Sequence, residues 1–361
     1  MRLVDYKNIF NTTMEDAVRI INSHINNGVP DDELLNVIQA LKYMDPEHLQ
    51  ADYGDELTNS VYMVKYGAAY ALEYAVMYDA VFNREKAAQY NHQKYISNIK
   101  PVTFGCGSFI STWSLGFIYA DKSEHCNRFN FIAPDVDIGV DLARWPLSFD
   151  LSEYEGHIRQ ELKQMDITEY INEHWNDSVN LLAFTKILNE LPAETVNSII
   201  NAIKRKAEEG CFSGDVYYLC ISHSKNEYDG KRRVQEIAEK LIDAINVNDD
   251  FVVDDTIPSY FYKNFYENSG SSYNLSKLKE IDTSASTKCY CFNSNGQNTY
   301  LPVRALFGNA FKISKNIDNL THQLQDYVET NQEDGEFRAI RSTSQVRLQV
   351  IRFTRKTGGN V

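Results

Sequence analysis

The sequence predicts an α/β protein whose central part is a doubly wound, largely parallel sheet. Three observations support this prediction. Short apolar segments alternate with amphipathic segments of helical length from residue 100 to 245, residues 1–99 contain only helical patterns, and strand patterns return near the C-terminus. Alternation of strands and helices is typical of parallel sheets that helices cover on both faces.

The first 99 residues are expected to form a helical region. Capping residues favour a helix after Asn11 that ends near Ile25, and another from Pro30 to Tyr43. The strongest helix signal covers 58–90, where aromatic residues recur every four positions. These residues are Tyr62, Tyr66, Tyr70, Tyr74, Tyr78 and Phe82. A stripe of this kind more often packs into a core than surrounds a substrate.

The region from residue 100 onward is expected to contain the sheet. We predict strands at 101–104, 136–140, 180–184 and 215–222, with a possible strand end at 165–167. Helices are expected at 109–119, 152–165, 194–209 and 231–245, and a polar loop at 121–130. We therefore divide the chain into a helical region, 1–99, and an α/β domain, 100–361. Residues 246–300 are interpreted as a loop-rich insertion, and strands are expected at 301–313 and 345–353.

Charge limits the partners that the protein can have. The chain has 36 basic and 50 acidic residues, a net charge of −14, and repulsion from phosphates disfavours general nucleic-acid binding. However, six basic residues and no acidic residue follow position 337: Arg338, Arg341, Arg347, Arg352, Arg355 and Lys356. This Arg338–Lys356 segment either forms a local basic patch for RNA, DNA or an acidic protein, or balances an acidic body.

Cysteine usage and hydropathy indicate a cytoplasmic protein. Only six cysteines occur in 361 residues, the N-terminus shows no apolar leader, and no apolar run approaches the roughly 20 residues that span a bilayer. We therefore expect free thiols and no membrane segment. The pair Cys289 and Cys291 is half of a metal site at most, so no metal is expected.

A glycine turn follows the first predicted strand. Gly105 and Gly107 would let a ligand approach the backbone where the next helix begins. A dinucleotide fingerprint would require another glycine at Ile110, which makes an NAD-binding enzyme a weaker alternative. A Gly-x-Gly pair is equally consistent with a simple tight turn.

Polar residues end the neighbouring strands. Asp141 ends the second strand, where a carboxylate can accept hydrogen bonds from ribose hydroxyls, although turn and cap aspartates are common. After the strand at 180–184, further polar side chains are expected at the same edge of the sheet. They are Thr185, Lys186, Asn189 and Glu190.

The order of the segments FGCGS, GVD, MDI, LLAFTKILNEL and DVYYLCISHS resembles class I S-adenosylmethionine-dependent methyltransferases, a Rossmann-like superfamily. The resemblance implies a doubly wound sheet that ends in an antiparallel strand. It also implies S-adenosylmethionine as cofactor, contacted by Phe104, Gly105, Cys106, Gly107, Asp141, Leu142, Asp166, Ile167 and Phe184. Two positions depart from the family pattern: Thr103 stands where an acid is usual, and Phe109 where the third glycine is usual.

The resemblance implies methyl transfer to an acceptor that the sequence does not identify, whether a small molecule, a protein or RNA. Glu190, Tyr66 and His223 are the candidate general bases. Trp113 and Trp145 flank the expected cleft and either fill the core or, in the case of Trp145, stack on adenine. Because of the two departures in the glycine loop, a catalytically inactive scaffold or protein-interaction module is the alternative.

Overall fold

The computed structural model describes residues 2–26, 29–43, 52–125, 134, 136–154, 156–188, 190–224, 230–254, 260–262, 288–292, 298–302 and 346–357. The N-terminal helices are α1 (Leu3–Ser23), α2 (Asp32–Tyr43), α3 (Glu56–Tyr62), the π-helix η1 (Met63–Gly67) and α4 (Ala68–Tyr90), with the hairpin β1 (Ile25–Asn26) and β2 (Val29–Pro30) between α1 and α2.

The elements of the α/β part follow in the chain order β3 (Pro101–Phe104), α5 (Ile110–His125), β4 (Val136–Asp141), β5 (Arg159–Gln164), α6 (Ile167–Glu173), β6 (Leu181–Thr185), α7 (Ala193–Glu208), β7 (Val216–Ser224) and α8 (Gly230–Ile245). The remaining strands are β8 (Phe251–Asp254), β9 (Tyr260–Tyr262), β10 (Lys288–Phe292), β11 (Asn298–Pro302) and β12 (Val346–Arg355).

The sheet has the predicted doubly wound arrangement. Its strands β5, β4, β3, β6 and β7 lie side by side in that order and are all parallel. The C-terminal strand β12 then pairs antiparallel with β7, and β8 pairs antiparallel with the opposite edge of β12. Strands β9, β10 and β11 continue from β12. The sheet is therefore mostly parallel and has an antiparallel C-terminal strand, as the sequence resemblance implies.

One predicted element is wrong, and another segment contains short strands in addition. Residues 159–164 form an edge strand, not part of a helix, because pairing with β4 outweighs the helix propensity of their Glu, Leu, Lys and Gln residues. The segment 246–300 is not simply loop-rich, since β8 completes the pairing of β12 and β9–β11 extend it. In addition, α5 continues to His125, into the expected polar loop. Residues 303–313 of the expected strand at 301–313 lie outside the described residues.

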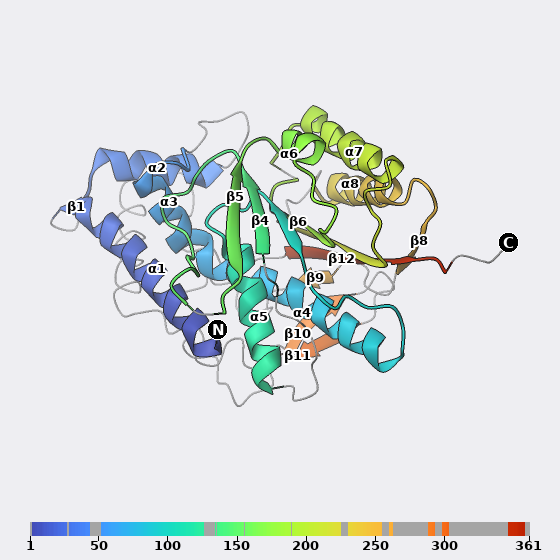
Figure 1. The fold of residues 1–361 in the computed structure, drawn as a ribbon. Coiled ribbons are helices and arrows are strands. Elements are labelled where there is room, and N and C mark those ends of the chain that lie inside the picture. Colours follow the sequence, from blue (N-terminus) through green and yellow to red (C-terminus); the bar gives the residue numbers. More distant parts are fainter. Residues whose placement is uncertain are drawn as a thin grey trace.

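Helices cover both faces of the sheet, as Figure 1 shows. On one face, α6, α7 and α8 bury an apolar cluster that contains Phe104, Phe184 and Ile199. On the other face, α1, α3, α4 and α5 share a single cluster with residues of the sheet such as Leu181 and Val350. The N-terminal helices therefore belong to the same core as the sheet, because α4 packs on β7 and β12, and α1 packs on α5 and α3.

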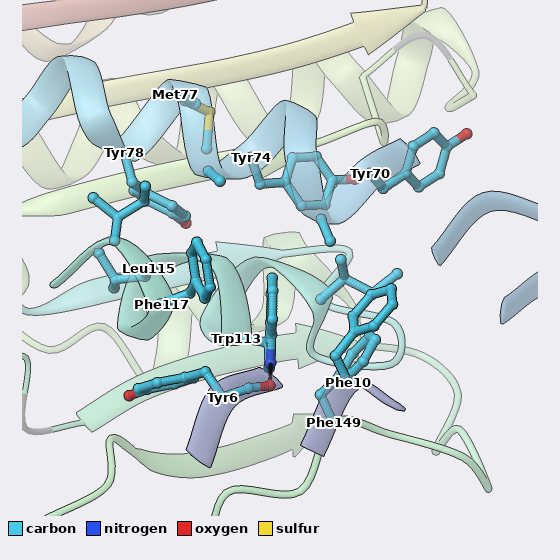
Figure 2. Close-up of a cluster of buried hydrophobic side chains, with 14 of the residues drawn as sticks. Tyr6, Phe10, Tyr70, Tyr74, Met77, Tyr78, Trp113, Leu115, Phe117 and Phe149 are labelled. Carbon is cyan, nitrogen blue, oxygen red and sulfur yellow. Dashed lines mark hydrogen bonds between the residues drawn. The ribbon is translucent and has the colours of Figure 1, made fainter. Parts of the chain in front are cut away.

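Aromatic side chains join α1, α4 and α5. Figure 2 shows Trp113 of α5 in the middle of this cluster, with Tyr6 and Phe10 on one side and Tyr74 and Tyr78 of α4 on the other. The indole N–H of Trp113 donates to the Tyr6 carbonyl oxygen at 2.8 Å, and the Phe10 ring lies 5.3 Å from the indole. Trp113 is therefore a core residue, and its polar atom is satisfied although it is buried.

The tyrosine stripe lies on a helix that changes its pitch. Tyr66, Tyr70, Tyr74 and Tyr78 are buried, as expected for a stripe that faces a core. In an α-helix a step of four residues exceeds one turn, so such a stripe drifts around the axis. The π-helix η1 has more residues per turn and opposes this drift, and the rings of Tyr62, Tyr66 and Tyr70 contact one another in sequence.

Part of the basic C-terminal segment is used inside the protein. Arg352 is buried, and its Nε donates to Glu85 at 2.8 Å. The Arg355 guanidinium lies 4.9 Å from the ring centre of Phe251, and Lys356 pairs with Asp249. Arg352 therefore cannot belong to a basic surface patch. Arg338 and Arg341 lie outside the described residues, and the side chain of Arg347 is not described.

Candidate functional site

The direction in which the chain winds through the sheet reverses at β3. From β3 the chain passes to β4 and β5 on one side, and then returns to β6 on the other side. Doubly wound sheets bind ligands beyond the carboxyl ends of the strands at such a switch point. Phe104 pairs with Val140 of β4 and with Phe184 of β6. Gly105, Asp141 and Thr185 consequently stand at the same level of the sheet.

The glycine turn after β3 has the backbone conformation that favours glycine. Gly105 and Gly107 have φ angles of +67° and +51°, and Phe109 has a φ of +57°. A side chain on Gly105 would place its Cβ 3.0 Å from Cβ of Ile187, and one on Gly107 would meet the Trp145 indole at 3.3 Å. The loop is therefore thin because neighbouring side chains pack directly on its backbone.

Phe109 is accommodated by a second glycine on the neighbouring strand. A Cβ on Gly139 of β4 would lie 2.7 Å from both Phe109 Cε1 and Cys106 Sγ. The ring of Phe109 and the thiol of Cys106 thus pack over Gly139, and both side chains are buried. The Phe109 ring, which stands where the family pattern has a glycine, therefore packs on β4 and does not project from the loop.

Asp141 joins the end of β4 to the glycine loop. Its Oδ2 accepts from the Gly107 N–H at 2.9 Å and its Oδ1 accepts from the Ala143 N–H at 3.1 Å. Burial raises the pKa of Asp141, and these N–H donors oppose the rise. The Leu142 N–H and the Trp145 indole N–H act in the same direction on this half-buried carboxylate, so ligand hydroxyls would replace some of these donors.

The other predicted contacts at this edge differ in their accessibility. Leu142 is 70% exposed beside Asp141, which leaves an apolar surface at the rim. Asp166 caps α6, with its Oδ1 accepting from the Thr168 N–H at 2.7 Å, and Ile167 is buried in the following turn. The Met165 N–H donates to the Asp141 carbonyl oxygen, so this turn lies next to the end of β4.

Three residues of the predicted cofactor set have core side chains. Phe104 and Phe184 stack at 4.7 Å beneath α6 and α7, and Cys106 is buried. Burial raises the pKa of the Cys106 thiol well above its ordinary value. These three residues can reach a ligand only through their backbone atoms.

A buried carboxylate lies beside Thr103, where the family pattern has an acid. Asp137 on β4 accepts from the hydroxyl groups of Thr103 at 3.0 Å and Thr112 at 2.6 Å. Burial raises its pKa from an ordinary 3.8 to about 6, although both hydroxyl groups act in the opposite direction. The adjacent strand thus supplies an acid on the α5 side of the sheet, which the sequence pattern did not reveal.

An aromatic group covers the glycine loop. The rings of Tyr53 and Trp145 stack at 4.6 Å, and Tyr62 meets Trp145 edge-on at 4.9 Å. Burial raises the pKa of Tyr53, and the negative charges of Glu190 and Asp141 raise it further. The group therefore lies between the end of β4 and the turn after β6.

The three candidate bases have different surroundings. Glu190 is half-buried in the turn after β6, where its N–H donates to the carbonyl oxygen of Ile187, and its charge raises the pKa of Tyr53. Tyr66 is buried, with its ring stacked on Tyr70 at 5.3 Å. The backbone of His223 lies near the end of β7, and the structure does not describe its side chain. Asn189 is outside the described residues.

A buried ion pair stands at the switch point. Lys186 directly follows β6, and its Nζ lies 2.6 Å from Glu73 Oε2 of α4. The same ammonium group is 4.9 Å from the ring centre of Tyr70. Lys186 was expected at this edge from the sequence, whereas Glu73 was not, because nothing in its local sequence indicates a partner so distant in the chain.

Two groups of described residues have metal ligands close together, His24 with Asp31 and Glu33, and Glu169 with Glu173 and His174. In the first group, Asp31 Oδ1 accepts from the Leu34 N–H and so already caps α2. The second group is exposed on α6 and the residue after it. We assign no metal site to either group. Separately, none of the described helices is long and apolar enough to cross a membrane.

Three solved structures to which the chain is similar are methyltransferases. The plantazolicin methyltransferase BpumL in complex with SAH aligns over 90% of this chain and 97% of its own, with 8% identity and a TM-score of 0.36. Loganic acid methyltransferase with SAH aligns over 86% and 98%, with 12% identity and a TM-score of 0.34. A SAM-dependent methyltransferase from Archaeoglobus fulgidus aligns over 75% and 92%, with 13% identity and a TM-score of 0.28.

No family model matches the chain, and no curated protein sequence is significantly similar to it. Likeness between structures at such low identity concerns the fold alone. Function must therefore be argued from the residues at the switch point.

Proposed function

We propose that this protein binds S-adenosylmethionine and transfers its methyl group to an acceptor. The observation that supports the proposal best is the Gly107–Asp141 hydrogen bond. It brings a glycine turn and a carboxylate together at the carboxyl ends of adjacent parallel strands. This is where a doubly wound sheet holds a nucleoside ligand.

The residues present fit such a cofactor. Gly105 and Gly107 carry no side chain in the loop, and Asp141 presents a half-buried carboxylate that can accept from ribose hydroxyls in place of its present donors. The exposed Leu142 and the Trp145 indole offer apolar surface for the adenine ring. When bound, the cofactor would supply an electrophilic sulfonium methyl group.

The protein's own contribution to the transfer is alignment and proton removal. Displacement at a methyl carbon requires the acceptor to lie in line with the leaving sulfur, and positioning alone supplies much of the rate acceleration. An acceptor that carries a proton also needs a base. Glu190 is the strongest of the three candidates, because it is half-buried and lies near the aromatic group beside the glycine loop.

Calorimetric titration with S-adenosylhomocysteine tests the cofactor site. We expect saturable binding by the wild-type protein and at least tenfold weaker binding by Asp141→Ala. Asp215→Ala is the control, since this exposed carboxylate pairs with Lys94 and precedes β7, at the opposite end of that strand from the site. Absence of binding at millimolar ligand, or equal affinity of Asp141→Ala and wild type, would refute the proposal.

The second candidate function is a scaffold that keeps the fold without the cofactor. Packing of the Trp145 indole on Gly107 favours it, because the same face of the loop is needed for a ligand. A stable complex with a cellular partner and no uptake of S-adenosylhomocysteine would support this candidate. Methyl transfer to any acceptor would exclude it.

A further inference from the structure

Lys186 holds a strained backbone conformation at the switch point. Its φ angle is +64°, in the left-handed region that side chains other than glycine seldom adopt. Such a residue persists only where its surroundings hold it. The Lys186 N–H donates to the Ser222 carbonyl oxygen of β7 at 2.8 Å, and the side chain reaches Glu73 of α4. The turn is thus attached at both its backbone and its side chain.

The ion pair that attaches the side chain is almost completely buried. The side chains of Lys186 and Glu73 are 4% and 3% exposed. Removing two charges from water offsets most of their attraction, and buried pairs can often be replaced by apolar residues without loss of stability. Stability alone is therefore a weak reason for this pair. The face of the Tyr70 ring further defines where the ammonium group lies.

The residues on either side of Lys186 touch the glycine loop. The Thr185 hydroxyl group donates to the Gly105 carbonyl oxygen at 3.2 Å. The side chain of Ile187 packs so closely on Gly105 that a Cβ there would be 3.0 Å away. Any shift of the turn at 185–187 would consequently move or release the first glycine of the loop.

We propose that Glu73 and Lys186 form a positioning pair for the glycine loop. The pair holds the turn after β6 against Gly105, so that the loop keeps one conformation, and neither residue needs to touch a ligand. The consequence for S-adenosylmethionine affinity rests on the proposed function. The effect on the loop itself does not.

Two double variants separate positioning from stability. In Glu73→Leu/Lys186→Met both charges are removed together, so no buried charge is left alone. In Glu73→Gln/Lys186→Gly the glycine adopts the left-handed conformation without strain, but the turn loses its attachment to α4. Lys204→Gln/Glu208→Gln is the matched control, because this pair is exposed on α7 with a separation of 3.8 Å.

The measurements are the melting temperature, the hydrogen-exchange rates of the Gly105 and Gly107 amides, and the affinity for S-adenosylhomocysteine. We expect both double variants to melt within about 5 °C of wild type. Their two loop amides should exchange at least tenfold faster than in wild type, and S-adenosylhomocysteine should bind at least tenfold more weakly. The control should leave all three measurements unchanged, and Lys186→Arg, which keeps a cation beside Glu73, should retain most of the loop protection.

Hydrogen exchange at the Gly105 and Gly107 amides tests the inference independently of cofactor binding. Exchange within twofold of wild type in the Glu73→Gln/Lys186→Gly variant would show that the turn needs no attachment and would overturn the inference. The same conclusion would follow if one double variant failed to fold and the other kept wild-type exchange. If neither double variant folded, the pair would be essential to the fold rather than to the loop, which also overturns it. Failure of wild type to bind S-adenosylhomocysteine would instead refute only the proposed function.

Discussion

Glu73 and Glu85 of helix α4 each form a buried ion pair, and the surroundings of the two pairs differ. Near its C-terminal end, Glu85 accepts from Arg352 Nε at 2.8 Å and from the Tyr218 hydroxyl group at 2.5 Å, and also from the Ile96 N–H. Arg352 is an ordinary strand residue of β12. Near its N-terminal end, Glu73 pairs with Lys186, a left-handed residue in the turn at the switch point.

Two buried carboxylate–cation pairs on one helix thus have different structural roles. The Glu85 pair fastens the last strand to the helical layer, and its backbone is unstrained. The Glu73 pair, in our interpretation, maintains a strained turn beside the ligand loop. Substitutions at the Glu85 pair should therefore change stability, and substitutions at the Glu73 pair should change the glycine loop. The following predictions test that division, from the largest expected effect to the smallest.

The largest effect is expected for Arg352→Met. This change leaves the Glu85 carboxylate buried without its cation, which typically costs about 3–5 kcal/mol. Urea unfolding should show the loss, whereas S-adenosylhomocysteine affinity of the folded fraction should stay within twofold of wild type. Lys94→Met is the control for an exposed pair and should cost less than about 1 kcal/mol. A large loss of S-adenosylhomocysteine affinity in Arg352→Met would contradict the assignment of different roles to the Glu85 and Glu73 pairs.

The buried carboxylate of Asp137 is expected to make stability depend on pH. Because its pKa is raised from 3.8 to about 6 in the folded protein, the folded state keeps a proton that the unfolded state loses. This contribution is full below pH 3.8 and is lost as the pH rises to about 6. The shift corresponds to about 3 kcal/mol.

Asp137→Asn removes this titration. The difference in unfolding free energy between Asp137→Asn and wild type should therefore move in favour of the variant by up to about 3 kcal/mol between pH 4 and pH 7. Chemical unfolding at several pH values measures this difference. A constant difference across the range would show that Asp137 does not titrate there.

Gly139→Ala tests the packing between β4 and the glycine loop by adding a methyl group there. Its Cβ would meet Cys106 Sγ and Phe109 Cε1 at 2.7 Å, so the glycine loop must shift. We expect a stability loss of about 1–3 kcal/mol together with at least tenfold weaker S-adenosylhomocysteine binding. Gly116→Ala is the matched control, because its Cβ would clash with the Tyr6 ring in the N-terminal core. It should lose stability and keep its affinity, and equal effects on affinity would contradict the assignment.

The smallest effect is expected at the cap of α6. Asp166→Ala removes the acceptor of the Thr168 N–H and should cost about 1 kcal/mol in unfolding free energy, whereas Asp166→Asn keeps the cap and should cost less than about 0.5 kcal/mol. Titration of both variants with S-adenosylhomocysteine sharpens the role of this residue. If both variants bind S-adenosylhomocysteine as tightly as wild type does, Asp166 caps α6 and does not contact the cofactor.

Much of the fold could be predicted from the sequence because its signals are local. The strand at 101–104, the strand that ends at Asp141 and the helix that ends at Ile245 depend on apolar runs and periodicity within a few turns. The glycine turn was visible for the same reason. The strand at 159–164 was missed because its residues favour a helix, and only pairing with β4 makes them extended.

The sequence by itself determined the α/β class, the chain order of the main strands and helices, and the juxtaposition expected for Gly105 and Asp141. The tertiary structure decided which carboxylates accompany them. Glu73 reaches Lys186, and Asp137 reaches Thr103 and Thr112, only because α4, β4 and α5 pack around the same end or face of the sheet. Contacts of this kind join residues distant in the chain, and local propensity contains no information about them because burial and geometry arise only when the elements assemble.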